Sequence, residues 1–234
     1  MTLLKTPTIL IFDVNETLLD LTSLEPFFAR VFGEARVMRE WFAQLVLYSQ
    51  TMTLSGAYAT FGNLAPGVLR MVGTTSGVAV TDDDVDELKK LIGSMPAHAD
   101  AAPALARLRD AGFRLVTLTN SPPSPTPTPL ERAGLAQYFE ATYSVHSVKK
   151  FKPAPETYRL VADELGVELE DTCLVACHLW DTVGAQEAGG MGAFVLRPGN
   201  ALLPTVGVAV PDLTVNDLGE LAECLIAQRA ATGN

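Results

Sequence analysis

Four short segments of this chain carry polar side chains that could do chemistry. They are Asp13 at the head of Asp-Val-Asn-Glu-Thr, the pair Thr119-Asn120, Lys152 in Phe-Lys-Pro, and Cys-His-Leu-Trp-Asp ending at Asp181. A lysine near an aspartate keeps the carboxylate ionised and holds it in one orientation. Threonine and asparagine side chains can hydrogen-bond an anion. If the fold brings these segments together, the chain carries a site built around a charged carboxylate.

Each segment also has an ordinary structural explanation. Asp13 and Asp181 could be loop or helix-capping residues, and Thr119-Asn120 could be a turn. His178 could be a buried histidine whose hydrogen bonds are satisfied. The functional interpretation therefore depends on the elements that position the four segments.

Outside a block at residues 21–96, short β-favouring runs alternate with segments of helical periodicity. We expect strands at Ile9–Phe12, Phe113–Thr119, Ala141–Val145, Cys173–Ala176 and Ala193–Leu196, and helices at Ala101–Ala111, Glu156–Leu165, Asp181–Ala188 and Asn216–Ile226. This alternation predicts an α/β fold with a parallel, doubly wound sheet. Ligands bind outside the carboxyl ends of the strands in such sheets, and the four polar segments lie at these ends.

Residues 21–96 show helical spacing without strand-like alternation. Trp41, Leu45, Tyr48 and Met52 recur at this spacing, and Thr81 followed by three aspartates is typical of a helix start. We therefore expect a helical subdomain at residues 21–96, inserted into a core domain made of residues 1–20 and 97–234.

Composition narrows the class of protein. The formal net charge is -10, which argues against nucleic-acid partners. We find neither an export signal nor an apolar stretch of membrane-spanning length, and therefore expect a cytoplasmic protein without a membrane partner. Cys173 and Cys177 lie in an apolar run and are interpreted as buried thiols in a reducing compartment, with a metal pair as the alternative.

Together, in this order at successive strand ends, the four segments resemble the motifs of the haloacid-dehalogenase superfamily. They are most similar to those of the type II 2-haloacid dehalogenases, over roughly residues 8 to 226. The resemblance implies a Rossmann-like core with a helical cap inserted after the first strand. It also implies a homodimer as a possible assembly.

The resemblance assigns a role to each candidate residue. Asp13 matches the nucleophile and Thr17 the hydroxyl that positions it, Lys152 the catalytic lysine, and Asp181 the acid that assists the hydrolytic water. Thr119 and Asn120 match a pair that holds the substrate; Tyr158, Phe61 and Trp180 match residues that line the site.

The implied reaction has two steps and requires no metal or other cofactor. The Asp13 carboxylate displaces halide from C2 of a short 2-haloacid and forms an ester. Water then hydrolyses the ester and frees a 2-hydroxy acid. The expected partners are therefore the small haloacid and the halide.

Two departures from the family pattern concern substrate binding and water activation. The family has an arginine early in the cap that receives halide, whereas alignment puts Trp41 here, with Arg39 two residues earlier. Trp41 could donate its indole N–H to halide, Arg39 could reach in, or Trp41 could simply pack in the cap. His178 stands where characterised enzymes tend to have asparagine, and could share in activating water.

Other functions stay open at this point. Phosphatases of the superfamily use a second aspartate where this chain has Asn15, and they hold Mg²⁺ with carboxylates that the last segment lacks. Another hydrolase using Asp13 on a different small carboxylic acid, or a non-catalytic binding protein, are the remaining alternatives.

Overall fold

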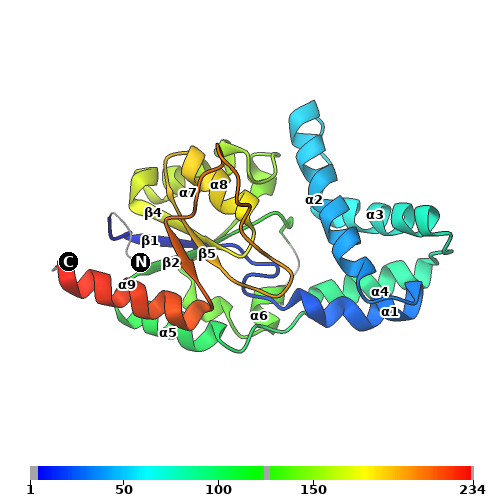
Figure 1. Ribbon diagram of the computed structural model, residues 1–234, viewed down its shortest axis with the longest axis horizontal. Coiled ribbons are helices and arrows are strands. Elements are labelled where there is room, and N and C mark those ends of the chain that lie inside the picture. Colours follow the sequence, from blue (N-terminus) through cyan, green and yellow to red (C-terminus); the bar gives the residue numbers. More distant parts are fainter. Residues whose placement is uncertain (1–4, 124–126, 233–234) are drawn as a thin grey trace.

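A six-stranded parallel sheet forms the centre of the protein in the computed structural model, which describes residues 5–123 and 127–232 (Figure 1). Its strands are β1 (Ile9–Phe12), β2 (Arg114–Thr119), β3 (Ala141–Ser144), β4 (Thr172–Ala176), β5 (Met191–Val195) and β6 (Leu213–Val215). They lie in the order β3-β2-β1-β4-β5-β6, the order of a Rossmann-type sheet. Every residue of β1 is buried, because this strand has a neighbour on each side and helices above and below.

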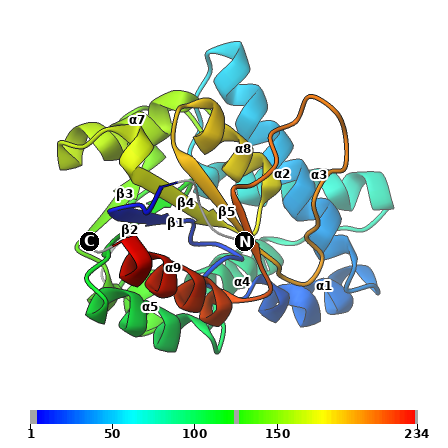
Figure 2. The same ribbon diagram turned by 60° about the vertical axis from the view of Figure 1, so that its left-hand side comes forward.

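Helices cover both faces of the sheet. Helices α5 (Ala101–Asp110) and α9 (Leu218–Thr232) pack on one face, and α7 (Pro155–Leu165) and α8 (Leu179–Glu187) on the other (Figure 2). From β1 the chain adds strands toward one edge of the sheet, and from β4 it adds them toward the other edge. The loops after these two neighbouring strands therefore diverge and leave a crevice. Asp13 follows β1 and His178 follows β4 at this point.

Four helices between β1 and α5 form a separate group beside the carboxyl ends of the strands (Figure 1). They are α1 (Glu25–Phe32), α2 (Val37–Ser55), α3 (Phe61–Ser76) and α4 (Asp82–Gly93). Thr81 caps α4 in a reciprocal capping box with Asp84, as the acidic start predicts. We refer to this group, residues 21–96, as the cap; its boundaries with the core stay a prediction.

The α/β fold class is confirmed, and the helix and strand bounds agree with expectation to within a few residues except at the carboxyl end. There β6 has three residues, too few for alternation to be recognised in the sequence. The last helix begins at Leu218 and continues to Thr232, later at both ends than the expected Asn216–Ile226. The described residues contain no helix with the length and hydropathy needed to cross a membrane.

Candidate active site

The strand ends bring Asp13, Lys152 and Asp181 into contact. Lys152 lies in the loop before α7, and its Nζ atom is 2.8 Å from Asp13 Oδ1 and 2.5 Å from Asp181 Oδ2. It also donates to the Leu118 carbonyl at 3.1 Å. The lysine side chain is only 1% exposed, so a fully buried ammonium bridges two buried carboxylates.

Burial and charge set the protonation of this group. Burial opposes ionisation of Asp13, but the charges of Lys152 and His178 outweigh it and hold the pKa of this carboxyl well below its usual range. Burial acts to lower the pKa of Lys152, yet the two carboxylates raise it overall. The pKa of Asp181 is raised, because burial and the Asp13 charge outweigh the attraction of Lys152. Asp13 is therefore the carboxylate that stays ionised and can act as a nucleophile.

Neighbouring groups fix the Asp13 and Lys152 side chains. The Thr17 hydroxyl donates to Asp13 Oδ2 at 2.7 Å and accepts from the Cys177 backbone N–H at 3.0 Å. Asn120 Oδ1 accepts from the Lys152 backbone N–H at 3.1 Å. Thr17 thus joins the end of β1 to the end of β4, and Asn120 joins the end of β2 to the lysine loop.

Tyr158 reaches the same cluster from the buried side of α7. Its hydroxyl donates to Asp181 Oδ1 at 2.6 Å and lies 3.1 Å from the Asp181 carbonyl. Burial and the charge of Asp181 raise the pKa of this phenol well above its usual value, so it remains a donor. Gly184 passes so close that a Cβ there would lie 2.6 Å from the Tyr158 hydroxyl, which explains the glycine at this position of α8.

A second charged chain begins at His178, whose Nδ1 is 3.2 Å from Asp13 Oδ2. Its Nε2 lies 2.8 Å from Glu16 Oε2, and Glu16 Oε1 accepts from the Arg39 guanidinium of helix α2. Burial acts to lower the pKa of the imidazole, but Cys177, Asp13 and Glu16 together raise this pKa well above its usual value. With His178 protonated, the buried carboxylates of Asp13, Asp181 and Glu16 face three cations.

Glu16 is a functional candidate that the sequence does not reveal. Its backbone has φ +68°, a left-handed conformation that costs a non-glycine residue about 1–2 kcal/mol, and its side chain is 3% exposed. Burial raises the pKa of Glu16, but His178 and Arg39 outweigh it and lower the value overall. A strained, buried, ionised carboxylate beside the nucleophile is typical of a functional position. The only signal in the sequence is its place three residues after Asp13.

The two candidates for halide binding are both engaged within the protein. The Trp41 indole N–H donates to the Ala65 carbonyl at 3.0 Å, and the ring packs against Phe28 at 5.3 Å. Arg39 is paired with Glu16 and donates to the Pro198 carbonyl at 2.7 Å. The Trp41 N–H is therefore not free to donate to halide, and packing within the cap accounts for this residue.

The other candidate substrate-binding residues contact residues near the carboxyl ends of the strands. Trp180 stacks on His178 with ring centroids 5.0 Å apart and lies 5.9 Å from Lys152 Nζ. Thr119 Oγ1 accepts from the Ser121 backbone N–H at 3.1 Å. Phe61 starts α3 and packs 6.1 Å from Phe151, next to the lysine.

A cavity of about 580 Å³ separates the cap from the strand ends. On the core side it is lined by Val14, Asn15 and Thr119, which flank the nucleophile and the Asn120 segment. Its cap side is mainly apolar, from Leu21, Trp41, Phe42, Leu45, Phe61, Ala65, Val85, Leu88 and Ile92. Phe42 also packs 5.5 Å from the His178 ring, so the cavity adjoins the charged cluster.

One set of potential metal ligands occurs among the described residues: Asp13, Cys177 and His178 have donor atoms within 4.8 Å of one another. The set does not fit a metal ion well. Metal ligands must be deprotonated, whereas the pKa of the Cys177 thiol is raised by burial and that of His178 is raised by its neighbours. Both flanking carboxylates, Asp13 and Asp181, are already bound by Lys152. We therefore assign no step to a metal.

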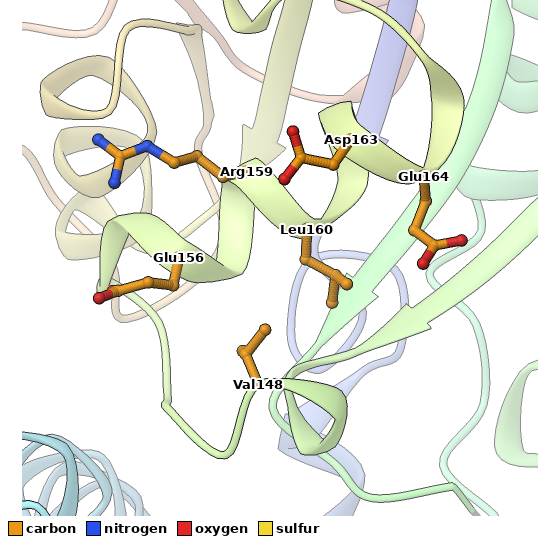
Figure 3. A pocket seen from close by; sticks show the side chains of 6 residues that line it. All are labelled: Val148, Glu156, Arg159, Leu160, Asp163 and Glu164. Atoms are coloured by element: carbon orange, nitrogen blue, oxygen red, sulfur yellow. The ribbon is translucent and has the colours of Figure 1, made fainter.

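A second hollow, of about 550 Å³, lies on the outer side of α7. Figure 3 shows charged side chains of this helix around it, among them Glu156, Arg159 and Asp163. Tyr158, on the buried side of the same helix, is the residue that reaches Asp181. The hollow offers no nucleophile beside a base, so we locate the active site at the cap-facing cavity.

Comparison with known proteins agrees with this site. A family model described as haloacid dehalogenase-like hydrolase matches residues 7–189. The chain therefore belongs to the haloacid dehalogenase-like hydrolases, and the resemblance inferred from the four segments is confirmed.

Individual relatives point to one branch of this family. (S)-2-haloacid dehalogenase 4A of Burkholderia cepacia is 30% identical over 214 residues, which cover 90% of this chain and 91% of that protein. (S)-2-haloacid dehalogenase H-109 of Pseudomonas putida is 27% identical over 220 residues, covering 93% and 97%. The solved structure of L-2-haloacid dehalogenase from Xanthobacter autotrophicus has a TM-score of 0.82 at 25% identity, covering 93% of this chain and 97% of that one.

Proposed function

We propose that this protein hydrolyses the carbon–halogen bond of 2-haloacids through an ester on Asp13. The observation that carries the proposal is the ionised Asp13 carboxylate at the switch point of the sheet, held by Lys152 and Thr17 beside a cavity. The relatives named (S)-2-haloacid dehalogenase support the same chemistry.

In the first step one Asp13 carboxylate oxygen attacks C2 of the substrate, and the bonding pair leaves with the halide. Lys152 and Thr17 hold the carboxylate in its attacking orientation, which contributes through positioning. Thr119 and Asn120 bind the substrate carboxylate; the Asn120 Nδ2 group has no hydrogen-bond partner among residues 5–123 and 127–232 and is available for this contact. In the second step water attacks the ester carbonyl and the 2-hydroxy acid leaves, with C2 inverted.

The cavity supports acceptance of substituents larger than methyl. A haloacid with about six non-hydrogen atoms occupies roughly 180 Å³ at water's ~30 Å³ per atom. The cavity volume of about 580 Å³ is within the range of about 300–1,000 Å³ that holds drug-sized ligands. Its apolar cap side suits an alkyl or aryl group on C2.

The decisive experiment measures halide release by purified protein from chloro-, bromo- and fluoroacetate and from both enantiomers of 2-chloropropionate, with a chelator present. We expect release without added metal and accumulation of a mass adduct on Asp13 after rapid quenching. Failure to release halide from any substrate, together with Mg²⁺-dependent hydrolysis of an aryl phosphate, would replace the proposal by a phosphatase. Asn15 weighs against that alternative, because an amide cannot protonate a leaving alkoxide.

Solvent oxygen gives an independent test of the covalent step. Over many turnovers in water enriched in oxygen-18, the label should enter the Asp13 carboxylate. Labelled product from a single turnover of unlabelled protein would instead mean that water attacks the substrate directly. The homodimer and the cytoplasmic location stay predictions, of which the first is tested by light scattering of the purified protein.

A further inference from the structure

The loop that carries the nucleophile needs support from other parts of the chain, because its backbone is strained. Glu16 adopts the left-handed region, with φ +68°, and a non-glycine residue keeps this conformation only when its surroundings hold it there. Thr17 follows directly and orients the Asp13 carboxylate through a hydroxyl that donates to Oδ2 at 2.7 Å. The orientation of the nucleophile therefore depends on the groups that fix the backbone of Glu16 and Thr17.

Arg197, in the loop after β5, holds this backbone directly. The Nε and Nη2 atoms of its guanidinium donate to the Thr17 carbonyl at 3.3 Å and 3.0 Å. The Arg197 side chain is only 7% exposed, so little water competes for that carbonyl. His98, just before α5, holds the preceding peptide unit, with Nε2 2.9 Å from the Glu16 carbonyl. Two consecutive carbonyls of the strained loop are thus bound by side chains from distant segments.

Asp100 fixes the Arg197 guanidinium in its place. Its carboxylate accepts from Nη1 at 2.9 Å and from Nη2 at 3.0 Å, a paired geometry that arginine provides and lysine does not. The same carboxylate accepts from the Leu218 backbone N–H at the start of α9, at 2.8 Å. Asp100 precedes α5, where an aspartate commonly caps the helix, but its side chain makes no capping bond. It is instead committed to Arg197 and to α9.

We propose that Arg197 and Asp100 form a brace that positions the nucleophile through Thr17, an inference that rests on the proposed function. The Thr17 hydroxyl and Lys152 contact the Asp13 oxygens themselves, whereas Arg197 binds the Thr17 backbone. Arg197 is therefore a positioning residue and not a catalytic one. Its contribution belongs to the first step, because the direction from which the Asp13 carboxylate approaches C2 decides the rate of attack.

Single-turnover halide release from 2-bromopropionate, with enzyme in excess, measures the first step in the variant Arg197→Lys. Lysine keeps the positive charge but cannot bind the Thr17 carbonyl and both Asp100 oxygens at once. We expect release to slow about tenfold to 10²-fold, since a misplacement of roughly 1 Å can cost about 10²-fold in rate. The enzyme concentration that gives half the maximal rate should not change, because the groups that bind the substrate are untouched.

The matched control is Arg114→Lys, the same substitution at an arginine remote from the strand ends that carry the site. Arg114 is the first residue of β2, so it lies at the opposite, amino end of that strand. It forms the same kind of paired bond, to Glu140 at 2.6 to 3.1 Å. Its replacement should leave single-turnover halide release at the wild-type rate.

A double-variant cycle separates positioning from general stabilisation of the fold. If Arg197 acts through the Thr17 hydroxyl, its replacement should matter little once that hydroxyl is gone. We therefore expect Arg197→Lys to slow halide release by only about twofold or less when it is introduced into Thr17→Val, the scatter within which independent effects are called additive. If the two residues acted independently, the two fold-changes in rate would multiply.

Asp100→Asn tests the same brace through a milder change. The asparagine keeps the shape of the side chain and one acceptor oxygen, but it loses the paired bond to Arg197. Halide release should slow in the same direction as in Arg197→Lys, by a smaller factor, and only in protein that retains the Thr17 hydroxyl. Should Arg197→Lys fail to fold, this variant decides between the two outcomes by itself.

Two results would overturn the brace. One is single-turnover halide release at the wild-type rate in folded Arg197→Lys or in Asp100→Asn. The other is slowing by the same factor with and without the Thr17 hydroxyl, which would mean that Arg197 only stabilises the fold. In both cases halide release and an Asp13 adduct in the wild type leave the proposed function standing. Their absence in the wild type would remove the proposed function and the brace together.

Discussion

Replacing Lys152 by methionine should destabilise the protein and abolish most of its halide release. The variant Lys152→Met keeps a long apolar stem but leaves the carboxylates of Asp13 and Asp181 buried with no cation between them. Removing one partner of a buried ion pair costs about 3–5 kcal/mol of unfolding free energy. We expect a loss of about 3 kcal/mol, the lower end of that range, because one of the two carboxyls can take up a proton and remove the repulsion.

The pH dependence of this loss has a definite sign. In the wild type the folded pKa of Asp13 is below its ordinary 3.8, so its contribution is present above that value and is lost only as the pH falls through the folded pKa. The folded pKa of Lys152 is above its ordinary 10.5, so its contribution persists up to that value and is lost as the pH rises through the folded pKa. Between about pH 5 and 9 Asp13 and Lys152 therefore contribute a constant stability. The pKa of Asp181 is raised, so its contribution is full at acid pH and is lost as the pH rises through its folded pKa.

The variant should behave in the opposite way. In the variant, two buried carboxyls lie side by side and share one proton, so the folded pKa of the protonated carboxyl is above its unfolded value. Its contribution to the unfolding free energy is therefore full only at acid pH and is lost as the pH rises through the folded pKa. Lys152→Met should consequently lose more stability than the wild type does between about pH 4 and 7.

Urea unfolding followed by circular dichroism at several pH values measures both effects. The matched control is Lys150→Met, the same substitution at a half-exposed lysine that pairs with Glu156 on the surface, where a loss below about 1 kcal/mol is expected. Halide release should fall about 10²-fold or more, as when a charge-stabilising donor is removed. An unfolding free energy within 1 kcal/mol of wild type, with unchanged pH dependence, would refute our account of the buried triad.

Three further predictions follow from the site. Asp13→Asn should form no adduct and release no halide; adduct formation in this variant would mean that another residue is the nucleophile. Thr17→Val removes a donor to Asp13 and an acceptor for a buried N–H, so it should lose about 1–3 kcal/mol of stability and slow the first halide release. In a series of substrates from 2-bromopropionate to 2-bromooctanoate, kcat/KM should rise with chain length. The variant Ala65→Leu places a larger side chain in the cavity lining, so it should reverse that rise and leave kcat/KM for 2-bromopropionate unchanged. A kcat/KM that does not change with chain length would show that the cavity does not bind the substituent.

The sequence was sufficient for the fold because its signals are local. The buried run Ile9–Phe12, the helical spacing around Trp41 and the capping residue Thr81 all act within a few residues, and each predicts its element. Alternation of strands and helices then restricts the sheet to a parallel one, which explains why β1 could be expected to be a buried strand with polar groups at its end. The three-residue strand β6 was not predicted, because its pattern is too short to recognise in the sequence.

The site was predictable as far as it follows from topology. Parallel strands end at one edge, so Asp13, Lys152 and Asp181 could be expected to converge there from their places in the chain alone. Halide-binding roles for Trp41 and Arg39 could not be decided in this way, because a side chain's hydrogen-bond partner depends on neighbours distant in sequence. The Trp41 partner is Ala65, and the Arg39 partners are Glu16 and Pro198.

Composition and spacing by themselves determined that this chain forms a wound parallel sheet with an acidic group at the end of its first strand. Only the tertiary structure decided which groups are charged and what they face. Glu16 turns inward at a left-handed backbone position and pairs with His178, a contact between residues 162 positions apart. Burial and proximity fix protonation, and both arise only when loops after β1 and β4 are packed against each other.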